Sequence, residues 1–323
     1  MVFAESDGQG TLTRLSGELM GIASRLAPSL GCGLEAIILG DGIKAAAEDL
    51  LRLGAGTVFA ADDPSLREYS PDLYQATLEN HLEGTAHLTL LAGHTFVAQD
   101  LMPRLSASLE AGLVTDCVGV DVTDSGELLL TKPVYGGNVV AQLRVNTPTC
   151  IATVRTRVGK APESPGNGSG KIVALSLASS EPRVRVLGSE VEGGSVKLEA
   201  ARAVVAGGRG MGGEAGFEDL EELAGLLGGA VGASRPPCDS GWIPSTSQVG
   251  ITGKIVAPDL YIAVAISGSS QHLSGMGESE KIVAINQDPD AYIFKVADYG
   301  VAGDWRQVLP AFTEGLRKYL RSQ

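Results

Sequence analysis

The first half of the chain alternates between helical and strand-like patterns of apolar residues. From Thr13 to Ala27 the apolar positions recur at helical spacing. Short apolar runs at Leu34–Leu39 and His87–Ala92 are typical of buried strands. Because helical stretches of about ten to fifteen residues separate such runs, the pattern predicts βαβ units and a parallel sheet. The same alternation predicts a helix at Ile43–Leu53, a strand at Thr57–Ala60 and a helix at Gln99–Leu109.

Beyond Val114 the pattern changes to strands joined by short turns, which predicts a meander or strands that make the sheet mixed. These strands are expected at Val118–Val122, Leu128–Thr131, Val139–Val145 and Thr149–Val154. Ala161–Gly170 is rich in Pro, Gly, Ser and Asn and is predicted to be a loop. Strand-like runs follow it at Lys171–Leu177 and Arg183–Leu187.

A shift in composition near Glu192–Ser195 predicts a domain boundary and a mobile link. We expect an α/β fold of two domains. Residues 1–193 form an N-terminal domain with a mixed or parallel sheet, and residues 194–323 form a doubly wound parallel sheet. The second domain is predicted to contain strands at Ala203–Ala206, Ala230–Ala233, Leu260–Ile266, Ile282–Ile285 and Phe294–Ala297. Its helices are expected at Phe217–Leu227 and Trp305–Leu320, the latter packing on its own domain.

Composition agrees with two folded domains and restricts the partners. The 323 residues are 44% hydrophobic and 20% charged, which excludes wholesale disorder. A formal net charge of −13 argues against nucleic acid or an anionic membrane surface as the main partner. An anionic ligand must therefore be held by local donors.

Targeting and metal signals are weak. The first residues, Met1–Asp7, carry acids where a secretory signal has bases, and the apolar stretch Leu260–Gly277 is interrupted by polar residues. We expect a cytoplasmic protein without membrane insertion. The cysteines are scattered and form no CxxC pair, so reduced thiols are expected and neither a metal site nor a disulfide framework. They are Cys32, Cys117, Cys150 and Cys238.

Three glycine- and hydroxyl-rich turns lie in the second domain. Gly207–Gly213 follows a predicted strand and contains the spacing GxGxxG, which lets backbone N–H groups approach a phosphate. The next strand ends in Ala233–Arg235 instead of the acid expected for a nicotinamide dinucleotide. Similar turns occur at Gln248–Lys254 and Ser267–His272. Because such turns converge on one crevice of a doubly wound sheet, they predict a dinucleotide ligand.

Long segments of the chain resemble the α subunit of electron-transfer flavoproteins. In the second domain they are GGRGMGGEAGFEDLEELAGLLGGAVGASRP, SQVGITGKIVAPDLYIAVAISGSSQHLSGM and KIVAINQDPDAYIFKVADYGVAGDW; in the first they are LLAGHTFVAQDLMPRLSASLEAGLVTDCVGV and the turn Pro133–Asn138. Ile251 stands where this family often has Gln, and Ser269–Ser270 stands where Ala and an apolar residue are usual.

The resemblance implies non-covalently bound FAD. Arg209 and Gly210 would lie near the pyrophosphate, with Ser234, Ser267 and Gly268 on the same side. Asn286, and Asp304 with Trp305, would hold the adenosine half. The remaining binding residues implied are Gln248, Val249, Gly250, Ile251, Ser269, Ser270 and Gln271.

The resemblance also implies three residues that tune the flavin. Arg235 would lie against the isoalloxazine ring, Thr252 would offer its hydroxyl near N5, and His272 would face the N1–O2 edge. A cation and fixed donors there favour the negative charge that one-electron reduction adds. His272 can carry a proton near neutral pH and is therefore expected to act as a switchable charge, although its place at a helix start disfavours the protonated form.

The family works as a heterodimer, so a β subunit is expected to bind mainly the first domain and to hold AMP or a second FAD. The chain would then be an electron carrier more than a catalyst, taking electrons from a flavin dehydrogenase such as an acyl-CoA dehydrogenase of fatty acid oxidation. A quinone reductase would be the acceptor. An electron-bifurcating, NADH-linked complex stays open, as does a nicotinamide- or nucleotide-binding module without flavin.

Overall fold

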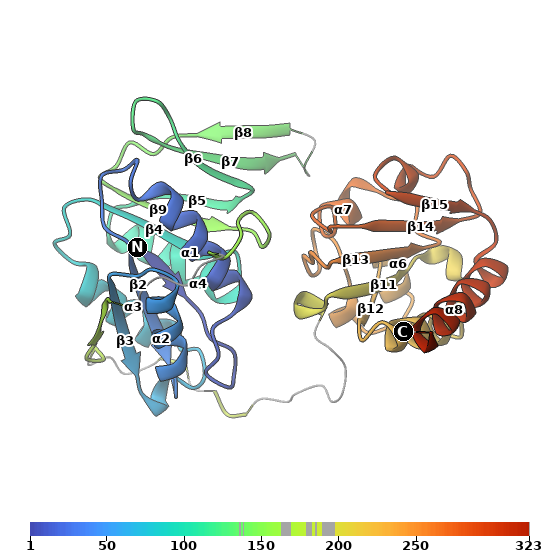
Figure 1. Cartoon of the computed structure of the whole chain (residues 1–323), viewed down its shortest axis with the longest axis horizontal. Helices are drawn as coiled ribbons and strands as arrows, with labels where there is room; N and C mark the ends of the chain where they lie inside the picture. The colour runs from blue at the N-terminus through green and yellow to red at the C-terminus, as the bar shows by residue number, and fades with distance from the viewer. Residues whose placement is uncertain are drawn as a thin grey trace. The chain divides into compact units, whose positions relative to one another are not determined.

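The hydrophobic runs of the two halves build two separate parallel sheets (Figure 1). A computed structural model describes residues 1–135, 137, 139–162, 169–178, 183–184, 186–188 and 198–322. The chain divides into two units, the first comprising Met1–Val134 and Val139–Ser189 and the second including Glu190–Gln323. The predicted boundary and link near Glu192–Ser195 lie outside the described residues.

The first unit contains a seven-stranded sheet in the order β10-β3-β2-β1-β4-β9-β5, in which every neighbouring pair is parallel. The three-residue strand β1 lies inside this sheet and is completely buried. The strands are β1 (Val2–Ala4), β2 (Glu35–Gly40), β3 (Thr57–Asp62), β4 (Leu88–Gly93), β5 (Gly112–Cys117), β9 (Thr149–Val154) and β10 (Lys171–Ala174).

Helices cover both faces of this sheet. Side chains alternate along a strand, so Ile38 of β2 packs with α1 and α2 whereas its neighbour Ile37 packs with α3 and α4. The side chain of Thr13 accepts a hydrogen bond from Ser16 N at 3.2 Å and so caps α1. The helices are α1 (Arg14–Leu26), α2 (Lys44–Arg52), α3 (Pro71–Leu82) and α4 (Phe96–Ser108), with a 3-10 turn η1 at Pro64–Leu66.

The antiparallel strands of the first unit form a sheet of their own and do not make the large sheet mixed. In this meander β7 (Leu128–Val134) pairs with both β6 (Gly119–Val122) and β8 (Val139–Leu143). The strand predicted at Thr149–Val154 instead joins the parallel sheet as β9. The α/β class is thus confirmed, with the parallel and antiparallel parts separated.

The second unit has a five-stranded parallel sheet in the order β12-β11-β13-β14-β15. Numbered within the unit, this is the doubly wound order 2-1-3-4-5, whose winding direction reverses between β11 and β13. The strands are β11 (Ala203–Gly207), β12 (Ala230–Ala233), β13 (Leu260–Val264), β14 (Ile282–Asn286) and β15 (Tyr299–Ala302).

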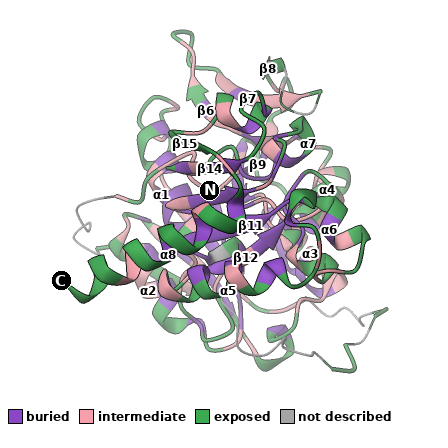
Figure 2. Cartoon of the chain, turned by 90° about the vertical axis from the view of Figure 1, so that its right-hand side faces the viewer, coloured by how far each residue is buried: buried purple, intermediate pink, exposed green. Residues whose placement is uncertain are grey.

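Two long helices, α5 (Gly216–Leu226) and α8 (Trp305–Arg321), pack together on one face of this sheet through a shared core. This confirms that the last helix packs on its own domain, and its outer face is exposed (Figure 2). A second core lies on the other face of the same sheet, and mainly irregular segments cover it. Short helices lie in the connections: α6 (Arg235–Asp239), α7 (Ser270–Leu273) and the 3-10 turns η2 (Leu198–Ala200), η3 (Arg209–Met211), η4 (Ser245–Ser247) and η5 (Tyr292–Lys295).

Two predicted strands are wrong. Phe294–Ala297 overlaps the 3-10 turn η5, whose Ile293 enters the core, and the edge strand is the fully exposed β15. Arg183 and Val184 form a bend because the carboxylate of Asp72 accepts hydrogen bonds from the Arg183 guanidinium and backbone N–H. In the described part of the chain, no helix is long and apolar enough to cross a membrane.

Candidate functional site

The turns that follow β11 and β13 meet at the point where the winding of the second sheet reverses. Doubly wound sheets bind ligands at this place, outside the carboxyl ends of the strands. Gly208 N donates to Val264 O at 2.9 Å. A Cβ added to Gly208 would lie 2.0 Å from the carbonyl oxygen of Ala265, so only glycine allows the two turns to approach this closely.

The loop Gln248–Lys254 joins the same edge. Val249 N donates to the carbonyl at the end of β12, Ala233 O, at 2.8 Å, and Ile251 N donates to Gln271 O at 2.8 Å. Gly250 has a φ of 148° and approaches that Gln271 carbonyl closely. All three turns that the glycine pattern singled out are therefore brought together.

Unused donors collect on the turns after β11 and β13. Within the described residues, the backbone N–H groups of Arg209, Gly210, Gly268 and Ser269 make no hydrogen bond. The exposed Arg209 guanidinium likewise has no ion-pair partner in that part of the chain. Ser234 begins α6 without using its hydroxyl as a cap. Free N–H groups beside a free cation are the donor set that a phosphate or pyrophosphate requires, so these residues fit the phosphate part of FAD.

The remaining residues of the β13 turn are presented to solvent or hold the turn. Gly268 has a φ of 83°, and a Cβ there would lie 2.3 Å from Ile293 N, so its conformation requires glycine. Ser267 accepts a hydrogen bond from that same Ile293 N through its carbonyl at 3.1 Å. Ser267, Ser269, Ser270 and Gln271 are exposed.

Two of the residues expected at the isoalloxazine end, Arg235 and Thr252, have side chains exposed to solvent. Arg235 is the first residue of α6, and its exposed guanidinium pairs with Asp239 at 3.1 Å. Thr252 is exposed, and its Oγ1 accepts a hydrogen bond from Gln248 Nε2 at 2.9 Å. Because that oxygen already accepts from the protein, the Thr252 O–H is free to donate to a ligand.

The expectation that His272 is a switchable charge is wrong. Its side chain is 4% exposed, with Nδ1 3.0 Å from Val249 O and Nε2 3.0 Å from the hydroxyl of Tyr261. Burial lowers the pKa of His272 to about 4, although the hydrogen bond to Val249 acts in the opposite direction. The imidazole is therefore neutral near pH 7, with both ring nitrogens already bound.

The residues assigned to the adenosine half also brace the site. Asn286 donates from Nδ2 to Ile266 O at 2.8 Å and accepts through Oδ1 from Asp288 N at 3.0 Å. Asp304 caps α8, and Trp305 Nε1 donates to Gly210 O at 3.0 Å, which ties the helix to the glycine turn. These bonds give all three residues a structural task, and their contact with a ligand stays a prediction.

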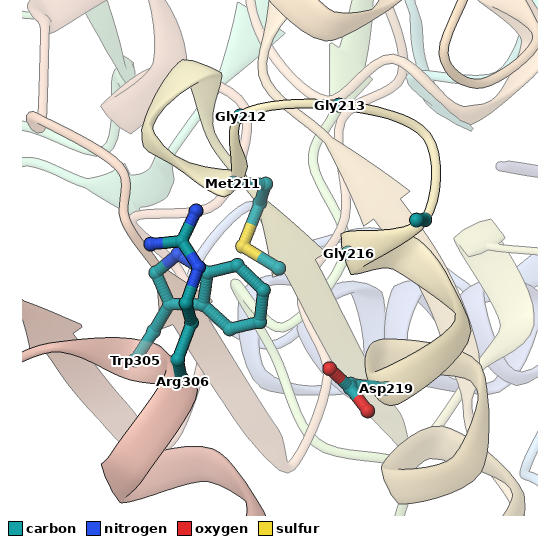
Figure 3. Close-up of a pocket in the computed structure, with 8 residues that line it drawn as sticks. Met211, Gly212, Gly213, Gly216, Asp219, Trp305 and Arg306 are labelled. Carbon is teal, nitrogen blue, oxygen red and sulfur yellow. The ribbon is translucent and has the colours of Figure 1, made fainter.

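A cavity of about 390 Å³ lies beside the glycine turn (Figure 3). Met211–Gly213 and the start of α5 form one wall, and Trp305 and Arg306 form another. The Arg306 guanidinium stacks on the Trp305 ring at 4.7 Å. Among the predicted site residues Trp305 alone lines this cavity, so it is a neighbour of the crevice between the turns and not that crevice itself.

Sequence reasoning missed Tyr261, which holds His272. The available signal was a tyrosine inside an otherwise apolar strand, because a buried hydroxyl requires a hydrogen-bond partner. All four cysteines are free thiols. Over the described residues, no group of three or more His, Cys, Asp or Glu side chains is placed to hold a metal ion.

Comparison with known proteins agrees with this arrangement. Residues 1–180 match the electron transfer flavoprotein domain, and residues 197–277 match the electron transfer flavoprotein FAD-binding domain. The chain is 40% identical to electron transfer flavoprotein subunit alpha of Thermoanaerobacterium thermosaccharolyticum, over 98% of this chain and 97% of that protein. It is 41% identical to subunit alpha of Megasphaera elsdenii, over 96% and 94% of the two chains. It is also 33% identical to the LctC subunit of the lactate dehydrogenase (NAD(+),ferredoxin) of Acetobacterium woodii, over 94% and 73%. The chain therefore belongs to the electron transfer flavoprotein α-subunit family.

Proposed function

We propose that this chain is the α subunit of a heterodimeric electron transfer flavoprotein and that it binds one FAD at the carboxyl edge of its second sheet. The observation that carries the proposal is the convergence of three turns there, with unused N–H groups beside Arg209, which has no ion-pair partner among the described residues. Because the whole chain has a formal net charge of −13, such local donors have to supply the attraction for the pyrophosphate.

Residues at the other end of the site suit the isoalloxazine ring. When bound, FAD supplies reversible one-electron chemistry. In this proposal Arg235 would be the cation that favours negative charge on the ring, and the free O–H of Thr252 would donate to a ring nitrogen or oxygen. Because burial lowers the pKa of His272, we assign the positive charge at the ring to Arg235. The exposed ion pair with Asp239, the last residue of α6, partly offsets that charge.

Partners follow from the family. The name of an α subunit implies a β subunit, and we propose that the first unit, which carries no cofactor motif, forms most of that interface. We propose that AMP or a second FAD is held in that subunit. The electron donor would be a flavin dehydrogenase such as an acyl-CoA dehydrogenase, and the acceptor a quinone reductase.

A second candidate is the α subunit of an electron-bifurcating, NADH-linked complex. It is favoured by the 33% identity to LctC, which is named as part of a lactate dehydrogenase that uses NAD(+) and ferredoxin. The two candidates differ in flavin content. One FAD with one AMP per heterodimer indicates the simple carrier, whereas two FAD and reaction with NADH indicate bifurcation.

The test is to co-express the chain with its β subunit, determine flavin and nucleotide content, and titrate the complex anaerobically with dithionite. We expect a yellow complex whose first one-electron reduction potential falls in Arg235→Ala. Arg202→Ala is the matched control, because Arg202 also forms an exposed ion pair, to Asp259 at 2.7 Å, but precedes β11 at the opposite edge of the sheet. A colourless complex would refute the proposed function, and an unchanged potential in Arg235→Ala would refute the role of that residue alone.

A further inference from the structure

Tyr261 lies in the middle of the second sheet with its hydroxyl in the core. It belongs to β13, pairs with Val204 on one side and Ile282 on the other, and is completely buried. Its hydroxyl contacts His272 Nε2 at 3.0 Å, and the two rings meet edge to face with centroids 6.0 Å apart. A buried hydroxyl lowers stability unless it forms a hydrogen bond, so the bond to His272 is needed to keep Tyr261 in this strand.

The opposite ring nitrogen determines which atoms carry the hydrogens. Val249 O can only accept, so Nδ1 of His272 must donate to it across 3.0 Å. In the neutral ring Nε2 is then an acceptor, and Tyr261 is its donor. The hydrogen bonds run in one direction from β13 through the imidazole to the loop Gln248–Lys254.

We propose that Tyr261 is a positioning residue that acts through His272 to hold the loop Gln248–Lys254 against the turn after β13. The proposal rests on the proposed function, since that loop carries residues expected at the flavin.

The hydrogen bonds of the loop explain how far this support reaches. The Val249 peptide is held from both sides, because its N–H donates to Ala233 O at 2.8 Å while its carbonyl accepts from His272. Gly250 follows directly, and Ile251 N binds Gln271 O one residue before the histidine. Removing the Tyr261 donor should therefore weaken the contact between His272 and Val249 O and, next to it, the contact between Ile251 N and Gln271 O.

The first experiment uses the heterodimer loaded with FAD. In Tyr261→Phe the ring still fills its place but the donor is lost, and we expect FAD to dissociate roughly tenfold more readily, as for one buried hydrogen bond. Tyr74→Phe is the matched control, because Tyr74 is a buried tyrosine of the first unit whose single O–H is shared between Leu39 O at 3.4 Å and Leu66 O at 3.3 Å. That variant should release FAD at the wild-type rate.

A double-mutant cycle separates positioning from simple packing. If Tyr261 acts through the imidazole, Tyr261→Phe should add less than a twofold change to His272→Leu. A full additional tenfold loss in the double variant would overturn the proposal, as would unchanged FAD release in Tyr261→Phe alone.

Nitrogen NMR of His272 gives a readout that does not depend on the flavin. We expect the hydrogen on Nδ1 in the wild-type protein and also in Tyr261→Phe, because Val249 O can only accept. In that variant the Nε2 signal should shift, because this nitrogen no longer accepts a hydrogen bond. A wild-type ring with its hydrogen on Nε2 would overturn the positioning role, even if Tyr261→Phe fails to fold. A heterodimer that holds no FAD but shows the Nδ1 tautomer would instead refute only the proposed function.

Discussion

Replacing Gly208 by alanine tests the geometry on which the site depends. The added methyl would lie 2.0 Å from the carbonyl oxygen of Ala265 and 2.6 Å from its carbon, both backbone atoms that cannot rotate away. Real Cβ contacts essentially never fall below 3.0 Å, so the turns after β11 and β13 must separate by about 1 Å. That movement stretches the hydrogen bond from Gly208 N to Val264 O, now 2.9 Å long.

The expected loss of stability follows from these two effects. Forcing one methyl group into a tightly packed place costs about 1–3 kcal/mol. Weakening a buried backbone hydrogen bond costs about 0.5–1.5 kcal/mol more. We therefore expect Gly208→Ala to lower the free energy of unfolding of the second unit by about 2–4 kcal/mol and to reduce its FAD content.

Tryptophan fluorescence is a suitable assay. The only two tryptophans of the chain, Trp242 and Trp305, lie in the second unit, so urea denaturation followed at this signal reports on that unit. Gly213→Ala is the control in the same turn, because a Cβ there meets nothing within 4 Å and its φ is not left-handed. It should change stability by less than about 0.5 kcal/mol. Equal midpoints and equal FAD content for both variants would refute the close-approach argument.

Three further predictions concern single side chains. The unfolded chain binds a proton at His272 below about pH 6.5, whereas the folded chain binds it only near pH 4. The stability of the second unit should therefore decrease as the pH is lowered from about 6.5 to about 4. The full effect is about 3 kcal/mol, and a slope unchanged in His272→Gln, measured by urea titration at several pH values, would contradict it. Trp305→Phe removes the donor to the glycine turn and should cost about 1 kcal/mol, with faster release of FAD; circular dichroism and gel filtration check both effects. In the wild-type protein Asp116 holds Arg155 by a bidentate contact that includes an Nη2–Oδ2 bond of 2.9 Å. Asp116→Asn removes the negative charge and leaves Arg155 without its ion pair. It should destabilise the first unit by about 3 kcal/mol, seen by hydrogen exchange, while FAD content stays normal.

Much of the fold could be predicted because its elements are long and periodic. The helix at Thr13–Ala27 and the strand at Ala230–Ala233 agree with α1 and β12 almost residue by residue. The helices and strands that were missed include β1, β5, β15, α3 and α6. Strand β1 is three residues long, and β15 is exposed along its whole length, so neither shows an alternation of apolar and polar positions.

The candidate site could be predicted only in outline. Glycine and hydroxyl residues after apolar strands indicated three turns and a dinucleotide, because the carboxyl ends of parallel strands share one edge. The protonation of His272 was predicted wrongly, since it depends on Tyr261 and Val249, which are distant from each other in the sequence.

Sequence patterns alone were enough to predict two α/β units, glycine turns after strands, and the motifs of a flavin-binding family. These are local properties, because periodicity and turn chemistry act between residues close along the chain. Which donors stay free for a ligand, and which already bind the protein, became visible only in the folded chain. In the described part of the chain Arg209 has no ion-pair partner, whereas His272 is held between a strand and a loop, and burial favours its neutral form. Hydrogen-bond partners and burial come from residues far apart in the chain, and no local pattern records them.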